Sequence, residues 1–326
     1  MHELSRDRTK ELLEAARGKE IAVIGDVMLD RYFWGAVSRV SPEAPVPVVD
    51  VESETIHLGG AANVAANLQA LGALPVLCGV IGDDTTGKMI KMLADDAGMN
   101  TSGLVVSSDR PTTVKTRVIG NNQQIVRLDR ETRTNVDGEV VEAIRTLVST
   151  RTNLAGVILE DYNKGLLTEE LIRAVIKAAN DRGIPVFVDP KKSNFFAYQQ
   201  AYVFKPNRKE ATDALGYAIR TDEEVHKAGV ELLERLGCEN VLITLGAAGM
   251  MLFERNGTVS SVPTIAKNVA DVSGAGDTAI ATLAALSTAG ANVREAATLA
   301  NIASGIVVEE PGIVSITAER LMAAIP

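Results

Sequence analysis

The sequence is poor in the residues that usually build disulfide, metal and nucleic-acid sites. Its 326 residues include two cysteines and three histidines, and neither type shows the spacing of a metal site. Aromatic residues make up only 4% of the chain, and a net charge of −9 argues against general affinity for nucleic acid or anionic lipid. A site for an anionic ligand must therefore be local.

Long hydrophobic runs and nucleotide-binding loops of the commonest kinds are also missing. No apolar stretch reaches the roughly 18 residues of a membrane span, and the first twenty residues mix acids and bases, unlike a secretory signal. Cys78 and Cys238 lie in apolar surroundings without CxxC spacing, as expected of buried thiols in a reducing compartment. The chain has no GxxxxGK[ST] loop, and no GxGxxG run opens at Gly25. We expect a cytoplasmic protein with no membrane or nucleic-acid partner.

What the sequence does contain is an alternation of short β-branched runs with helical segments. This pattern is typical of a mostly parallel sheet covered by helices on both faces. We predict one doubly wound α/β unit over residues 1–326, with strands at 21–24, 75–80, 155–159, 185–188, 201–204 and 241–245 and helices at 61–71, 84–97, 136–148, 168–181, 221–236, 275–289 and 294–308. The Gly-rich run at 82–87 reads as a turn capped by Asp83 or Asp84.

Two segments, about 32–58 and 112–129, break this alternation because they are rich in Val, Thr, Ile and aromatics and show no helical pattern. We expect antiparallel strands that pair into a small β-sheet lid over the mouth of the main domain. Two solvent-facing hairpins without a role are the alternative. An outer lid face carrying Tyr32, Phe33 and Trp34 would expose apolar surface, so we expect a homodimer through the lid.

The clearest site signal is the run from Asp271 to Asp277, followed directly by a helix of small residues. Its glycines allow a tight turn, and the amides of Gly274, Ala275 and Gly276 would point outward at a helix N-terminus, where phosphate binds. A plain capping loop is the alternative. Asp277, placed after the glycines, suits a base that removes a hydroxyl proton as a phosphoryl group arrives.

A second cluster lies near the first predicted strand. Gly59 and Gly60 open a helix of very small residues, and Asn63 on its first turn can both donate and accept hydrogen bonds to a hydroxyl. Close packing of helix on sheet would favour the same small residues. Asp26 and Asp30 follow the first strand, where carboxylates suit sugar hydroxyls, although Asp26 would serve equally well as a turn cap.

A third cluster follows the predicted strand at 201–204. Asn207 and Glu210 are one helical turn apart and could hold the water shell of Mg²⁺, or they could form a capping box. The turn from Thr244 through Gly246 to Gly249 is either a hairpin or a loop beside a nucleotide.

Taken together, these segments resemble the ribokinase-type (PfkB) carbohydrate kinases, in the correct order over nearly the whole chain. Gly59, Gly60 and Asn63 match the sugar-side signature, and Asn207 with Glu210 matches the Asn-x-x-Glu motif. The late signature matches 271–277, apart from Val272 and Ser273 where many relatives carry threonine. The resemblance implies a ribokinase-like fold with ATP and Mg²⁺ as cofactors, and it allows a monovalent cation as a further cofactor. It also implies an anion hole at Gly274, Ala275 and Gly276, Asp277 as the base, and a nucleotide near Thr244, Gly246, Gly249 and Asn301.

Longer runs outside these signatures resemble the branch of the family that phosphorylates D-glycero-β-D-manno-heptose 7-phosphate, at 25–32, 38–49, 122–129, 161–165 and 188–191. This resemblance implies transfer of the ATP γ-phosphate to the anomeric O1, giving the 1,7-bisphosphate on the route to ADP-heptose and the lipopolysaccharide core. Some kinases of this branch are fused to a nucleotidyltransferase, and a chain ending at residue 326 resembles the stand-alone form.

A sugar phosphate needs a cationic pocket on the lid side, and several basic residues of the insertions and their neighbours are candidates, although each alone could be a solvated charge. They are Arg39, Lys115, Arg117, Arg127, Lys164 and Lys191. Asp30, Gly60 and Asn63 would then orient the sugar hydroxyls. The alternatives are a kinase for another sugar or sugar phosphate, and a catalytically silent ligand-sensing protein on the same fold.

Overall fold

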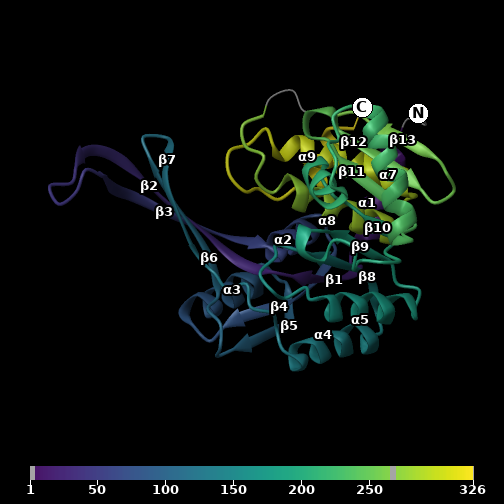
Figure 1. Ribbon diagram of the computed structural model, residues 1–326, viewed down its shortest axis with the longest axis horizontal. Helices are drawn as coiled ribbons and strands as arrows, with labels where there is room; N and C mark the ends of the chain where they lie inside the picture. The colour runs from purple at the N-terminus through teal and green to yellow at the C-terminus, as the bar shows by residue number, and fades with distance from the viewer. Residues whose placement is uncertain (1–3, 265–268, 326) are drawn as a thin grey trace.

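The computed structural model describes residues 4–264 and 269–325, which fold around one large and one small β-sheet (Figure 1). The large sheet has the order β13-β12-β11-β10-β9-β8-β1-β4-β5 and is parallel except at β12 and β13. Its strands are β1 (Glu20–Gly25), β4 (Leu74–Gly82), β5 (Asn100–Ser107), β8 (Leu154–Glu160), β9 (Val186–Asp189), β10 (Val203–Phe204), β11 (Asn240–Thr244), β12 (Met250–Glu254) and β13 (Val259–Val262).

Helices cover both faces of this sheet. One face carries α1 (Arg6–Ala16), α2 (Ala61–Ala70), α3 (Thr85–Asp96), α8 (Ala275–Thr288), α9 (Val293–Val307) and α10 (Ala318–Ala323). The other carries α4 (Gly138–Thr150), α5 (Glu169–Asn180), α6 (Arg208–Leu215) and α7 (Asp222–Leu236). Two single turns of 3-10 helix, η1 (Lys192–Asn194) and η2 (Gly246–Ala248), lie in loops. The predicted doubly wound α/β fold is confirmed.

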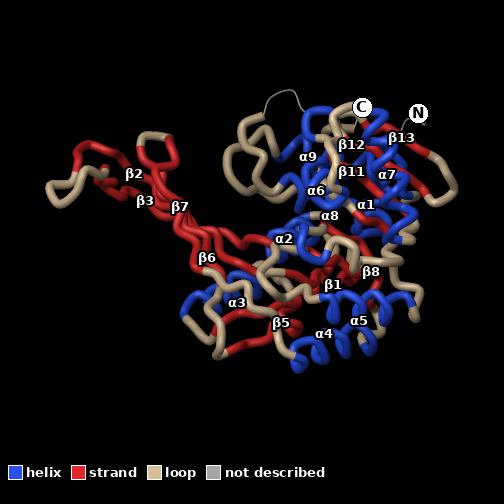
Figure 2. The backbone as a smooth tube through the Cα atoms, in the orientation of Figure 1, coloured by secondary structure: helices blue, strands red, loops and turns tan. Residues whose placement is uncertain are grey.

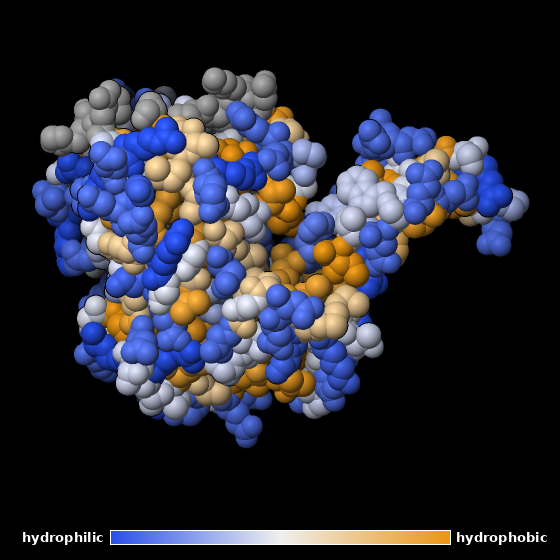
Figure 3. Space-filling model, turned by 180° about the vertical axis from the view of Figure 1, so that it is seen from behind, coloured by the Kyte–Doolittle hydropathy of each residue, from blue (hydrophilic) through white to orange (hydrophobic). Residues whose placement is uncertain are grey.

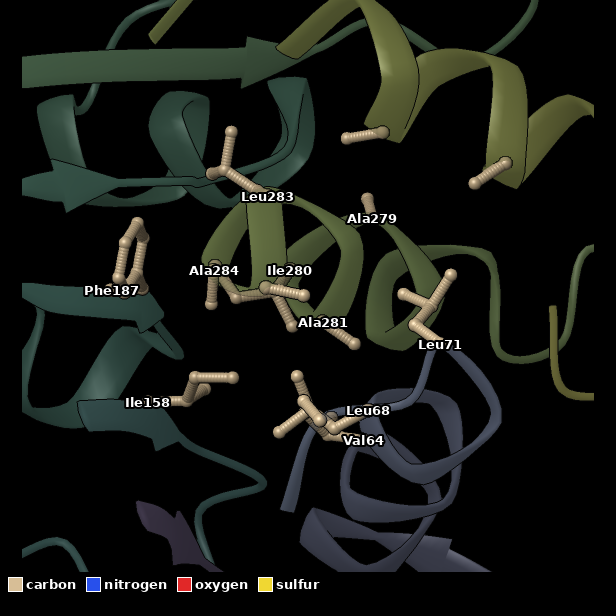
Figure 4. Close-up of a cluster of buried hydrophobic side chains, with 14 of the residues drawn as sticks. Val64, Leu68, Leu71, Ile158, Phe187, Ala279, Ile280, Ala281, Leu283 and Ala284 are labelled. Carbon is tan, nitrogen blue, oxygen red and sulfur yellow. The ribbon is translucent and has the colours of Figure 1, made fainter. Parts of the chain in front are cut away.

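The two-sided sheet follows from the strand sequences. In β1, Ile21 and Val23 belong to the buried cluster on one face and Ala22 and Ile24 to the cluster on the other, because successive side chains of a strand point to opposite faces. On the first face, the small residues of α8 allow close contact with α2 and the sheet (Figure 4). That packing brings the N-terminal ends of α2 and α8 to the same edge of the sheet.

The small sheet has the order β3-β2-β6-β7, built from β2 (Val27–Val40), β3 (Pro47–Gly60), β6 (Thr113–Gly120) and β7 (Gln123–Arg130). It forms an arm that leaves the body beside α2 and α3 (Figures 1 and 2). The predicted pairing of the two insertions into one sheet is confirmed. The expectation of antiparallel strands is wrong at one place, since β2 and β6 run parallel.

The expected outer face of Tyr32, Phe33 and Trp34 is also corrected. Tyr32 is buried and stacks on Trp34, and both lie on the face of β2 that also carries Asp30, whereas Phe33 points to the opposite face. Alternation along the strand separates the three aromatics. The other face of the small sheet, which we call its outward face, carries Phe33 with Val126 and Leu128, which are 43% and 58% exposed. Apolar residues are visible along the arm in Figure 3.

One aspartate ties the arm to the body. Asp84 caps α3 by accepting from the Gly87 amide at 2.8 Å, as the sequence predicts. The same carboxylate accepts from the amide and hydroxyl of Thr112 at 3.1 and 2.7 Å, and Arg130 approaches it to 3.4 Å. The two ends of the β6–β7 hairpin, at Thr112 and Arg130, therefore both contact the residue that caps the N-terminus of α3.

Other sequence expectations can be checked directly. Cys78 and Cys238 are buried free thiols, as predicted. Among the described helices, none is long and apolar enough to cross a membrane. The sequence analysis did not predict α1, β5, α6, β12, β13 or α10 as separate elements. Most of these are short or lie at the edges, where the apolar pattern is weak.

Candidate active site

A cavity of about 570 Å³ opens where the parallel strands β9 and β10 end and α8 begins. Ligands bind at this edge in open α/β sheets, since the strand ends and helix starts meet there. The lining brings together predicted residues from four separate segments, namely Lys191, Asn207, Glu210, Thr244, Gly246, Gly274, Gly276 and Asp277.

Asp277 lies on the first turn of α8 and is 5% exposed. Its Oδ2 accepts from the Asn63 side-chain amide at 2.6 Å, and its Oδ1 accepts from the Tyr162 hydroxyl at 2.8 Å. Burial raises the pKa of Asp277 to about 6, against the opposing effect of these two hydrogen bonds. The carboxylate is therefore ionised at neutral pH yet basic enough to take a proton.

The turn before Asp277 requires glycine at one position. Gly274 caps α8 with a left-handed φ of 79°, and a Cβ there would lie 3.1 Å from the Asn63 amide nitrogen. Gly276 faces the cavity near Lys205, whereas the Ala275 amide donates to the Val272 carbonyl at 3.3 Å. Backbone at both glycines is thus open to a ligand in the cavity.

Three carboxylates converge behind the cavity. Glu160 and Asp189 end the neighbouring strands β8 and β9 in register, and their oxygens lie with one of Asp277 within 4.8 Å of one another. Lys205 donates to Asp189 at 2.7 Å. Burial, followed by the charges of Asp189 and Asp277, raises the pKa of Glu160 well above its ordinary value. Because Lys205 supplies the countercharge, we assign no cation to this group.

Asn207 and Glu210 form the capping box of α6. The Asn207 side chain accepts from the Glu210 amide at 2.8 Å, while Glu210 accepts from the Asn207 amide at 2.8 Å and from Lys191 at 2.5 Å. Both readings of this motif remain compatible, since the pair also lines the cavity. Each Glu210 oxygen keeps a lone pair for water, so the donor set fits a hydrated Mg²⁺ bound through its waters.

The sugar-side residues meet where β2, β3 and α2 join. Asp30 is buried and paired with Arg117 across the small sheet. A Cβ at Gly59 would lie 2.1 Å from the Asp30 carboxylate, so glycine there leaves room for that side chain. Gly60 caps α2 with a φ of 60°, and Asn63 follows on its first turn. This junction places Asn63 between the small sheet and Asp277.

Asp26 has a structural role in the fold. Its Oδ2 accepts from the amides of Tyr162 and Lys164 at 2.9 and 3.0 Å, and it is 5% exposed. It therefore fixes the loop that follows β8, in agreement with the turn-cap reading. Asp30 is the aspartate of the pair that lies at the junction with α2.

The basic candidates divide into two groups. Lys115 and Lys191 lie over the Tyr162 ring, 5.0 and 5.5 Å from its centre, and Lys164 pairs with Glu131 at 2.6 Å. The charges of Lys164 and Arg117 act on Lys115, so these cations are neighbours. Arg127 pairs with Asp129 at 2.9 Å on the exposed strand β7, and Arg39 lies 3.7 Å from Asp50 far along the arm. Of the six candidates, Lys191 lines the cavity, Lys115 and its neighbours Arg117 and Lys164 lie outside the lining, and Arg127 and Arg39 are exposed.

Two nucleotide-side candidates also lie outside the lining. Gly249 sits in the turn before β12, where a Cβ would meet the Val262 carbonyl oxygen at 2.1 Å. Asn301 is buried on α9 and donates to the Pro263 carbonyl at 2.7 Å. Both shape the loops behind the cavity, whereas Thr244 and Gly246 face it directly. The Thr244 to Gly249 turn joins antiparallel strands, so it is a hairpin that also borders the cavity.

Four site residues were not singled out from the sequence: Glu160, Tyr162, Asp189 and Lys205. Three of them follow buried apolar runs at the carboxyl ends of β8, β9 and β10. A charged residue closing a buried strand is therefore the signal that would have found them. Tyr162 lacks even that signal, because only the folded loop turns its hydroxyl toward Asp277.

Known proteins resemble this chain over nearly its whole length. The chain is 46% identical over 319 residues to the Bifunctional protein HldE of Caulobacter vibrioides and 42% identical over 323 residues to that of Pelobacter propionicus. The matches cover 97% and 99% of this chain but 65% and 66% of those proteins. The chain thus spans about two thirds of the length of these relatives.

Solved structures share the fold at low identity. A ribokinase from Arabidopsis thaliana complexed with ribose and ATP superposes with a TM-score of 0.75 at 22% identity, covering 94% of this chain and 99% of that one. The tetrameric inhibited form of phosphofructokinase-2 from Escherichia coli gives 0.77 at 17% identity, with coverage of 94% and 99%. The fold is therefore ribokinase-like. Because the sequence model for pfkB family carbohydrate kinases matches residues 19–319, the chain belongs to that family.

Proposed function

We propose that this chain transfers the γ-phosphoryl group of ATP to the anomeric O1 of D-glycero-β-D-manno-heptose 7-phosphate. The observation that carries the proposal is the buried, ionisable Asp277, fixed at the start of α8 on the wall of the cavity. The five runs that resemble heptose 7-phosphate kinases, and the relatives named HldE, support this choice of sugar over others.

In this mechanism, Asp277 takes the proton of the O1 hydroxyl while O1 attacks the γ-phosphorus. The bond from that phosphorus to the bridging oxygen breaks, and ADP leaves. The backbone at Gly274 and Gly276 is placed to stabilise the charge on the transferring group. Mg²⁺, held through water by Asn207 and Glu210, would neutralise phosphate charge when bound.

The 7-phosphate is assigned to the cations on the arm side of Tyr162. Lys115 is the best candidate, since within residues 4–264 and 269–325 no carboxylate lies within ion-pair distance of it, and burial lowers its pKa. A desolvated ammonium gains most from an arriving dianion. Arg117 and Lys164 already have carboxylate partners and would add to the field, while the arm would exclude water from the reacting groups.

A homodimer through the small sheet is part of the proposal. Phe33, Val126 and Leu128 form an apolar stripe on the outward face of the arm, where a second copy of the same stripe would cover it. The opposite face carries Asp30, Lys115 and Arg117, the proposed sugar-side residues, so a dimer formed through the stripe leaves these residues uncovered.

Phosphorus NMR separates the candidate substrates. The protein is incubated with ATP, Mg²⁺ and one of heptose 7-phosphate, ribose or fructose 6-phosphate, and products are followed over time. A glycosyl phosphate signal formed only with heptose 7-phosphate supports the proposal, because only transfer to the anomeric oxygen gives it. Faster turnover of another sugar refutes the substrate, and no turnover of any sugar favours the ligand-sensing alternative.

A further inference from the structure

The side chain of Tyr162 occupies an unusual position, on the cavity wall and in direct contact with Asp277. Its hydroxyl carries one proton, which it donates to Asp277 Oδ1 at 2.8 Å, opposite the Asn63 amide on Oδ2. Burial and the neighbouring charges of Asp277 and Glu160 raise the pKa of Tyr162 well above its ordinary value. Both burial and these charges therefore favour the protonated phenol, the form that donates the hydrogen bond to Asp277.

The backbone that carries Tyr162 is fixed on both sides. Its amide donates to Asp26, and Asp161 accepts from the Asn163 amide at 2.7 Å and from the Tyr198 hydroxyl at 2.8 Å. Asn163 adopts a left-handed φ of 57°, which those bonds hold in place. The loop cannot shift the phenol away from the base without breaking several buried hydrogen bonds.

The ring is held as firmly as the loop. Lys115, from β6 of the small sheet, lies 5.0 Å from the ring centre, and Lys191, after β9, lies 5.5 Å from it. Both ammonium groups are attracted to the electron-rich ring face. The ring thus contacts a cation of the arm and a cation bound to Glu210, and its hydroxyl donates to the proposed base.

We propose that Tyr162 is a positioning residue for phosphoryl transfer, whose hydroxyl, together with Asn63, fixes the plane of the Asp277 carboxylate toward the acceptor hydroxyl and keeps that carboxylate ionised. The inference rests on the proposed role of Asp277 as the base. Two donors on one carboxylate stabilise its charged form. Hydrogen bonds to both oxygens also restrict the rotation of the carboxylate, so that it stays in the orientation needed for proton transfer.

Removing the phenol oxygen tests this directly. Tyr162→Phe keeps the ring that the two lysines contact but removes one donor from Asp277. We expect kcat to fall about tenfold to a hundredfold, as for loss of a hydrogen bond to a charged group, with KM for ATP changed less than about threefold. The acid limb of the kcat/KM profile should move to higher pH, because that hydrogen bond lowers the pKa of Asp277.

The profile must be read against the charged and polar groups that the described residues place around Asp277. These are Asn63 from α2, Glu160 from β8 and Tyr162 from the loop after it, Asp189 from β9, Lys191 just after β9 and Lys205 just after β10. The substitution leaves all of them in place apart from the phenol oxygen. A shift in the acid limb therefore reports the lost donor rather than a new charge.

Tyr217→Phe is the matched control, since it removes a phenol-to-carboxylate hydrogen bond, from Tyr217 to Glu231 at 2.9 Å, that lies outside the cavity lining and away from the Tyr162 loop. It should leave the pH profile unchanged. An unmoved acid limb in Tyr162→Phe, or an equal shift in Tyr217→Phe, overturns the inference.

The sugar used is the one that the unchanged protein phosphorylates fastest, so an error in substrate does not affect the result. Asp277→Asn is measured alongside. If that variant retains turnover, the proposed base itself fails; if it is inactive while Tyr162→Phe behaves like the unchanged protein, only the role of Tyr162 fails.

Discussion

Replacing Asp277 by asparagine should remove most turnover, and the stability of the variant relative to the unchanged protein should rise with pH. The carboxylate is buried, and its pKa of about 6 compares with an ordinary value of 3.8. The folded protein therefore binds this proton more tightly than the unfolded chain does. Stability is lost as the pH rises from about 4 through about 6, and the loss is complete above about 7.

The size of the effect follows from the two pKa values. Ionisation of Asp277 costs the folded state about 3 kcal/mol at pH 8 and roughly half as much at pH 5. Asparagine removes that cost, but its amide meets two donors, Asn63 and Tyr162, and one of them loses its acceptor. That loss costs about 1 to 3 kcal/mol at every pH, so only the pH-dependent part identifies the charge.

The assay is urea denaturation of both proteins at pH 5 and pH 8. The stability of Asp277→Asn relative to the unchanged protein should increase by about 1.5 kcal/mol between these pH values. Asp84→Asn is the control of opposite sign: burial raises the pKa of Asp84, but hydrogen bonds from Thr112 and Gly87 outweigh it, and the pKa is lowered. A relative stability of Asp277→Asn that is equal at pH 5 and pH 8 would refute the reasoning.

Three further changes test other parts of the site. Gly59→Ala places a methyl group against Asp30 and should raise KM for the sugar at least tenfold, with little change in KM for ATP. Steady-state kinetics measures both constants, and equal effects on the two contradict the assignment of Gly59 and Asp30 to the sugar side. Lys115→Met should raise KM for a sugar phosphate about tenfold to a hundredfold but not that for the unphosphorylated sugar, and a parallel rise in both would exclude a phosphate contact. Leu128→Glu puts a charge into the apolar stripe and should shift the sedimentation coefficient toward the monomer, whereas an unchanged value rules out this interface.

The fold was largely predictable because its signals are local. Central strands such as β8 and β9 are short apolar runs, and α8 and α9 are long helices with small or periodic apolar residues. The pairing of the two insertions was predicted from composition, but the parallel register of β2 with β6 was not. The hydrogen bond from the Thr112 amide to Asp84 holds the start of the second insertion, and with it the direction in which β6 runs beside β2. Both residues lie far from β2 in sequence.

The candidate site was predictable only where one motif carries the chemistry. Asp277, Gly274 and Asn207 stand in such motifs, and all three line the cavity. Basic residues carry no comparable signal, because a lysine or arginine in a strand looks the same whether it faces solvent or a ligand. Arg127 and Lys115 are two strand residues of the same insertion, yet one pairs with Asp129 in solvent and the other lies over a buried ring.

The charges behind the cavity bear on why the proposed base lies at this place. Glu160, Asp189 and Asp277 bring three carboxyl groups together in a buried space, and the ammonium groups of Lys205 and Lys191 act on them. Burial and the charges of Asp189 and Asp277 raise the pKa of Glu160 well above its ordinary value, and burial raises that of Asp277 to about 6. The fold thus concentrates an electrostatic cost around the proposed base, and the hydrogen bonds from Asn63 and Tyr162 reduce that cost.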